Sequence, residues 1–134
     1  MPIFKHFDLT ALRRDPQIAY YFRYPLYHSD FQAIRANGRL LGYAAAKPLY
    51  GRLTAAGQVD RSAGFNGQIA VLFIKSPARS ARRAEILLTA VPPAELTRPD
   101  GKRNWPVIRA AAEATVRAHV PPPPDRAPEG ARPQ

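Results

Sequence analysis

The sequence predicts an α+β domain with a mainly antiparallel sheet, two short helices, a C-terminal helix and a proline-rich extended tail. Short segments alternate between apolar and polar residues, as half-buried strands do. Turn and cap signals separate these segments at short intervals. One longer segment, residues 105–119, repeats its apolar residues with the spacing of an amphipathic helix.

The chain is expected to open with a strand and a short helix. Residues 2–7 are mostly apolar and predict the strand. Asp8 is placed to cap a helix over Leu9–Arg14. Pro16 ends this helix, because a proline disfavours helical backbone at the residue before it.

A second strand is predicted over residues 17–24, where the pattern alternates with period two. Tyr21 and Arg23 are expected on its outer side. The inward, core-forming side would carry Ile18, Tyr20, Phe22 and Tyr24.

A short helix is predicted after Ser29. Ser29 and Gln32 have the spacing of a capping box. Phe31 and Ile34 are expected to face the core, and Asn37-Gly38 supplies a left-handed stop.

The middle of the chain predicts further strands. Residues 39–46 form one that Pro48 breaks, and residues 59–65 form another. Asn66-Gly67 is the strongest hairpin signal, because both positions of a type I′ turn need positive φ.

Two apolar segments, residues 68–75 and 84–91, are expected to be central strands of the sheet. The first is nearly continuous in apolar residues, so it should be buried on both faces. A basic loop, residues 76–83, connects the two strands.

Residues 99–101 (Pro-Asp-Gly) mark a turn before the last helix, which is predicted over Trp105–His119. Asn104 is its N-cap and Pro106 lies in its first turn. Its apolar stripe contains Trp105, Ile108, Ala112 and Val116, and its polar side contains Arg109, Glu113 and Arg117.

Length and composition predict one domain over residues 1–120, followed by a tail over residues 121–134 that is flexible or ordered by a partner. The chain has no cysteine, no long apolar run and no apolar leader at its N-terminus. We therefore expect no membrane association, and a cytoplasmic protein or a virion component of bacterial or phage origin.

Charge is the strongest compositional feature. Twenty basic side chains against ten acidic ones give a net charge of +10, and sixteen of the twenty are arginine. Arginine suits phosphate and stacks on aromatic rings, so nucleic acid or another polyanion is the expected partner. A GC-rich genome, which favours arginine, alanine and proline codons, is the alternative explanation.

A nucleic-acid site would combine phosphate contacts with base stacking. The aromatic stretch around residues 20–31 supplies the rings, although alternating aromatics on a strand also form cores. The predicted binding residues are Tyr21, Arg23, Tyr27, Arg35, Arg39, Arg79, Arg82 and Arg83.

Other site classes lack a motif. His6, His28 and His119 are widely separated, so no metal site is predicted. The chain contains no P-loop, no dinucleotide-binding glycine pattern and no nucleophile elbow.

Two short segments resemble ADP-ribosyltransferases of the DarT type. In residues 26–41 a Tyr27-His28 pair precedes Gly38 and a Leu-Leu, and residues 84–93 match the context of that family's catalytic glutamate. The resemblance implies that His28 binds the nicotinamide ribose of NAD and that Glu85 orients NAD for attack by a nucleic-acid base. Ser29 follows Tyr-His where the family has Ile-Thr, and the family's central insertion has no counterpart.

The leading hypothesis is a non-enzymatic, nucleic-acid-associated module that requires no cofactor. The DarT-like transferase is the first alternative. The second is a structural assembly protein of phage head or neck type, whose tail, residues 121–134, orders on a neighbouring subunit.

Overall fold

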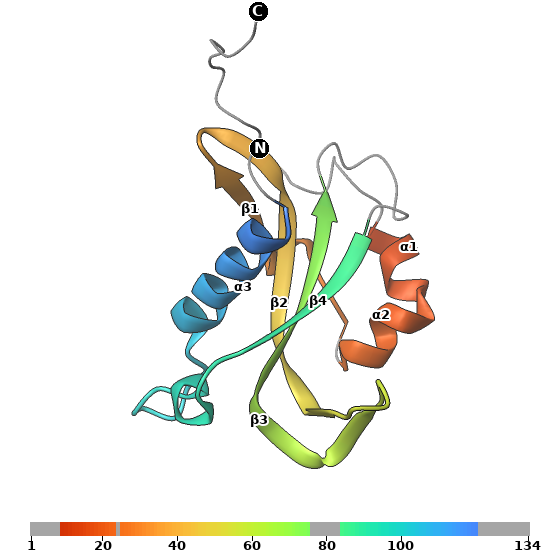
Figure 1. Ribbon diagram of the computed structural model, residues 1–134, viewed down its shortest axis with the longest axis vertical. Coiled ribbons are helices and arrows are strands. Elements are labelled where there is room, and N and C mark those ends of the chain that lie inside the picture. The colour runs from red at the N-terminus through yellow and green to blue at the C-terminus, as the bar shows by residue number, and fades with distance from the viewer. Residues whose placement is uncertain (1–8, 24, 76–83, 121–134) are drawn as a thin grey trace, which may run out of the picture.

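Four antiparallel strands form one sheet in the order β1-β2-β3-β4, so each strand pairs with its neighbours in the chain (Figure 1). The computed structural model describes residues 9–23, 25–75 and 84–120. The strands are β1 (Phe31–Ala36), β2 (Arg39–Leu53), β3 (Val59–Lys75) and β4 (Ala84–Ala90). The predicted antiparallel sheet is confirmed.

Helices cover both faces of this sheet. The C-terminal helix α3 (Trp105–His119) lies on one face, and α1 (Leu9–Arg14) and α2 (Pro16–Tyr21) lie on the other (Figure 1). Within the described residues, the 3₁₀ helices η2 (His28–Asp30) and η4 (Pro93–Leu96) connect elements. The fold is therefore α+β, as predicted, with helices α1 and α3 at their predicted positions.

The sheet separates two apolar cores. Alternate residues of β3 enter opposite cores, because successive side chains of a strand point to opposite faces. One set, Ala70, Leu72 and Ile74, packs with α1 and α2, and the other, Ile69, Val71 and Phe73, packs with α3. The prediction that this segment is buried on both faces is confirmed.

The predicted strand over residues 17–24 is wrong, because Pro16–Tyr21 is a helix. Asp15 accepts a hydrogen bond from the Gln17 N–H at 2.9 Å, so Asp15-Pro16 starts a helix as N-cap and first residue. Ile18 and Phe22 are buried at i,i+4 spacing, whereas Tyr20 is exposed. A helical period therefore decides burial here.

The helix predicted after Ser29 is also wrong. Asp30, rather than Gln32, closes the capping interaction by accepting from the Tyr27 N–H at 2.8 Å, and only the 3₁₀ helix η2 follows. Strand β1 then begins at Phe31. Phe31 and Ile34 are buried as expected, but in different cores.

Two turn signals act differently from the prediction. Asn37 and Gly38 both have positive φ, 53° and 76°, and form the β1–β2 hairpin turn rather than a helix stop. Asn66-Gly67 lies inside β3, where the pairing with β2 shifts register, and it forms no hairpin. The β2–β3 turn is at residues 54–58, where the Thr54 N–H donates to the Gln58 carbonyl at 2.7 Å.

Two strand predictions need smaller corrections. Strand β2 continues through Pro48 to Leu53. Its pairing with β1 ends at Ala45, so Pro48 lies where β2 has no described neighbour on that edge, and a proline without an N–H is tolerated there. Strand β4 pairs antiparallel with β3 but lies at the edge of the sheet, not at its centre.

In α3, Ile108, Ala112 and Val116 are buried as predicted, whereas Trp105 remains 37% exposed. Arg117 and Glu113 form the predicted i,i+4 ion pair at 3.3 Å. The predictions for residues 2–7, Asp8, Tyr24, residues 76–83 and the tail lie outside the described residues.

Arg61 ties α2 to the β2–β3 hairpin. Its guanidinium donates to the Tyr50 carbonyl at 2.8 Å and to the Tyr20 carbonyl, and it lies 5.5 Å from the Tyr20 ring centroid. The Tyr20 hydroxyl in turn accepts from the Val59 N–H at 2.8 Å. One side chain thus bridges the end of α2 and both strands.

We expect Arg61→Ala to lower the free energy of unfolding by about 1–2 kcal/mol, because two charge-assisted hydrogen bonds and a ring contact are lost. Urea denaturation measures this. Arg52→Ala is the control, since Arg52 is an exposed arginine on the neighbouring strand, and a loss as large there would contradict the bridging role.

Candidate nucleic-acid interface

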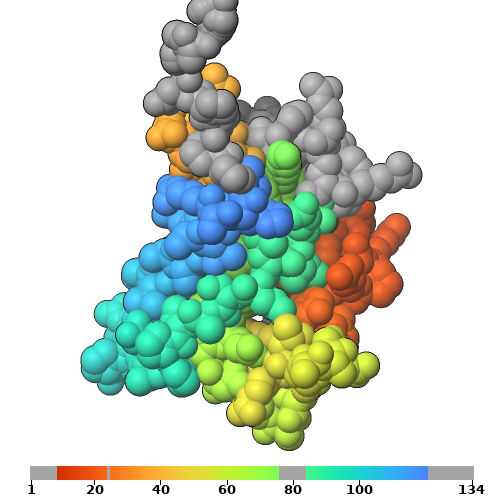
Figure 2. All heavy atoms as spheres, in the orientation of Figure 1, coloured from red at the N-terminus to blue at the C-terminus, as the bar shows by residue number. Residues whose placement is uncertain are grey.

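Strands β2 and β3 are longer than the two outer strands, β1 and β4. Pairing with β1 ends at Phe31–Ala45, and pairing with β4 ends at Gln68–Ala90. Residues 49–53 and 59–67 therefore form a two-stranded extension, whose yellow tip lies at the lower end of the molecule (Figure 2). The edge of β2 that β1 leaves unpaired adjoins the candidate site.

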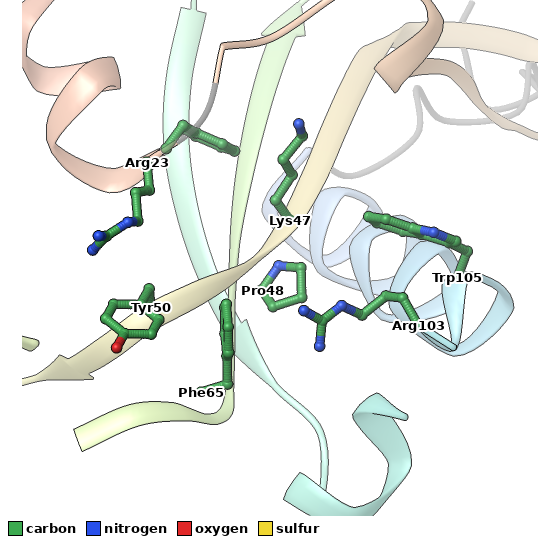
Figure 3. Close-up of a pocket in the computed structure, with 8 residues that line it drawn as sticks. Arg23, Lys47, Pro48, Tyr50, Phe65, Arg103 and Trp105 are labelled. Atoms are coloured by element: carbon green, nitrogen blue, oxygen red, sulfur yellow. The ribbon is translucent and has the colours of Figure 1, made fainter. Parts of the chain in front are cut away.

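A hollow of about 210 Å³ lies at this edge (Figure 3). The end of α2 borders it on one side, and the segment that begins α3 borders it on the other. Its described lining contains aromatic and basic side chains and no carboxylate: Phe22, Arg23, Lys47, Pro48, Tyr50, Phe65, Arg103 and Trp105.

We call this hollow the groove, and two of its aromatic residues lie on strands β2 and β3. Tyr50 and Phe65 are paired across β2 and β3, with ring centroids 4.9 Å apart in an edge-on arrangement. Phe65 is 43% exposed and Trp105 is 37% exposed. Aromatic surface is therefore open to solvent in a position where a planar ligand can contact it.

The cations of the groove lie against these rings. The Arg23 guanidinium carbon is 4.6 Å from the Tyr50 centroid, and that of Arg103 is 4.7 Å from the Phe65 centroid. Neither arginine forms a salt bridge with any residue that the structure describes. Lys47 is held by Asp30 at 3.6 Å and by the Pro25 carbonyl at 3.4 Å.

Local backbone geometry positions two of these side chains. Gly67 has φ +98°, and its Cα faces the Val91 carbonyl so closely that a Cβ would lie 2.3 Å from that oxygen. This bulge sets the direction of the strand that carries Phe65. The predicted turn at residues 99–101 is present, and an isolated bridge between Thr97 and Arg103 brings Arg103 to the groove.

A second hollow, of about 300 Å³, adjoins the first, since both are lined by Phe22 and Arg23. Arg13 lies at its border, with its guanidinium carbon 4.9 Å from the Tyr27 ring centroid. Apart from Arg13, Phe22 and Arg23, its described lining is aliphatic: Ile18, Ala19, Pro25 and Leu26.

At the tip of the extension, the Asp60 carboxylate accepts from the Ser62 hydroxyl at 2.6 Å and from the Ser62 N–H at 3.1 Å. These hydrogen bonds, with a smaller contribution from the Arg52 charge, hold the pKa of Asp60 below its ordinary value of 3.8. Asp60 is thus ionised at neutral pH, and its carboxylate is hydrogen-bonded to Ser62 of the same strand.

The predicted binding residues divide into separate regions. Arg23 lines the groove, Tyr27 is 54% exposed and contacts Arg13 of the second hollow, and Tyr21 is only partly buried against the core. Arg35 and Arg39 lie at the β1–β2 turn, up to about 36 Å of extended strand from Tyr50. Arg79, Arg82 and Arg83 lie outside the described residues.

The structure does not bring His28 and Glu85 together. His28 lies in η2, directly before edge strand β1, whereas Glu85 lies in the opposite edge strand, β4. The Glu85 carboxylate contacts His119 Nε2 of α3 at 2.5 Å. The DarT-like activity stays a prediction that no observed contact favours.

Most groove residues lie outside the predicted binding set. Tyr50 follows the predicted end of its strand at Pro48, Phe65 belongs to a predicted alternating strand, and Trp105 belongs to a predicted apolar stripe. Lys47 and Arg103 belong to no local motif. One sequence feature could have indicated that Tyr50 and Phe65 are exposed: glycine and proline residues lie close to both, and such residues mark positions where strands bulge.

The chain was compared with protein-family models, curated proteins and solved structures, and none matches it. Among the described residues, no helix is long and apolar enough to cross a membrane. No cluster of potential metal ligands occurs among the same residues.

Proposed function

We propose that this protein binds nucleic acid through the groove between α2 and the start of α3. The observation that carries the proposal is the pairing of arginine with exposed aromatic surface in a hollow whose described lining holds no carboxylate. Phosphates and bases need these two kinds of contact respectively.

The electrostatic part follows from the groove's arginines. Arg23 and Arg103 each place the guanidinium group over an aromatic ring, and a guanidinium in a cation–π contact can still donate N–H groups to phosphate oxygens. The net charge of +10 attracts a polyanion from a distance. Lys47 adds a third positive charge at the groove, although Asp30 partly offsets it.

We expect the affinity for a fluorescein-labelled oligonucleotide to fall log-linearly with salt, because each neutralised phosphate releases bound counterions. The double variant Arg23→Gln/Arg103→Gln should weaken binding by about 10-fold or more and reduce the salt slope by about 2. Fluorescence anisotropy over a salt series measures both quantities.

Arg35→Gln/Arg39→Gln is the matched control, because it removes the same charge at the other end of the sheet. It should change affinity much less than the groove variant. Equal weakening by the two double variants would show that the groove is not the site, and absence of binding at low salt would refute the proposal.

A further inference from the structure

The groove and the second hollow adjoin each other at Arg23, which lines both. The first is lined by aromatic rings and cations, and the described lining of the second is mainly aliphatic, with Arg13 at its border. Among the residues that the structure describes, only Phe22 and Arg23 line both. A ligand that fills both hollows therefore contacts Arg23.

Each hollow is small. Volumes of about 210 and 300 Å³ lie at or below the lower end of the range of about 300–1,000 Å³ for ligand pockets. Each accordingly suits one planar ring system rather than a larger ligand. Phe65 and Trp105, which are partly exposed, offer aromatic surface in the first hollow, and Ala19 and Pro25, which are exposed, offer apolar contact in the second.

Arg23 has the geometry of a phosphate contact between two such rings. Its guanidinium carbon lies 4.6 Å from the Tyr50 ring centroid, and this cation–π contact restricts where the guanidinium group can lie. A planar fork held in this way can donate two parallel hydrogen bonds to one phosphate. Lysine, with a point charge, cannot reproduce that geometry.

We propose that the groove and the second hollow together select unpaired nucleic acid and hold two consecutive nucleotides, with one base in each hollow and the linking phosphate on Arg23. This inference rests on the proposed nucleic-acid binding. Duplex bases are stacked and paired, so they cannot enter the hollows, and a duplex offers the groove only its phosphates.

The first test compares three fluorescein-labelled probes at equal salt: a thymidine strand of about twelve nucleotides, an abasic strand with as many phosphates, and a duplex of the same length. The base-containing single strand should bind about 10-fold or more tightly than either of the others. Trp105, the only tryptophan, lines the first hollow, so its fluorescence should change with the thymidine strand and not with the abasic strand.

The second test titrates thymidine 5′-phosphate and oligothymidylates of two, three and four nucleotides against Trp105 fluorescence. The step from one nucleotide to two should give the largest gain in affinity. Arg23→Lys, which keeps the charge, should reduce this gain several-fold while leaving the thermal melting temperature unchanged.

The outcomes are distinguishable. If all three probes bind equally and with a steep salt dependence, selection of unpaired bases is overturned while nucleic-acid binding stands. Equal gains for every added nucleotide, or an Arg23→Lys variant that keeps the gain, would overturn the two-nucleotide site. If no probe binds, the proposed function fails as well.

Discussion

Replacing Gly42 with alanine is expected to lower the melting temperature by about 10 °C or more. Gly42 lies in β2 where the pairing with β1 shifts register. A Cβ at this position would lie 2.2 Å from the Ile74 carbonyl oxygen and 2.7 Å from the Phe73 ring. Both neighbours belong to the buried part of β3, so neither can move without disturbing the cores.

Overpacking of this kind costs about 1–3 kcal/mol, and we expect the upper end because one contact is with backbone. For a chain of this size, about 3 kcal/mol corresponds to about 10 °C. Gly57→Ala is the control: Gly57 also has positive φ, +82°, but a Cβ added there would meet no atom within 4 Å. If both variants melt within a few degrees of each other, the close approach at Gly42 is not present.

Replacing Phe65 and Trp105 together with alanine is expected to weaken single-strand binding by about 10-fold to 100-fold. Stacking of a base on an aromatic side chain contributes about 1–3 kcal/mol by alanine substitution, and both rings border the first hollow. Both side chains are partly exposed, so the folded domain should persist. Anisotropy with a labelled thymidine strand measures the loss, and circular dichroism checks the fold.

The conservative pair Phe65→Tyr/Trp105→Phe keeps two rings at these positions and should retain most of the affinity. The salt slope should be similar in both double variants, because no charge is removed. Retention of full affinity by the alanine pair would mean that stacking in this hollow contributes nothing to binding.

Some elements were predictable because their signals act locally. Residues 105–119 carry a full helical period with proline in the first turn, and Ile108, Ala112 and Val116 are buried as that period requires. Residues 68–75 are nearly all apolar, which forces burial on both faces wherever the strand pairs. Neither result depends on a distant residue.

Other sequence patterns are compatible with two local structures, and the neighbouring residues do not decide between them. Asn37-Gly38 allows positive φ at a helix stop and equally in a type I′ turn, and the burial of Phe31 and Ile34 in opposite cores selects the turn. Asp15-Pro16 ends one helix and starts the next, and this hides α2 within an apparently alternating segment.

The candidate site shows the same division more sharply. The sequence by itself determined a basic, arginine-rich chain, an α+β domain and the placement of Arg23 among possible binding residues. The tertiary structure decided that Tyr50, Phe65, Arg103 and Trp105 share one groove with Arg23. These residues are far apart in the chain. They meet because β2 and β3 continue beyond the last residues that pair with β1 and β4, which leaves an unpaired edge of β2 between α2 and α3.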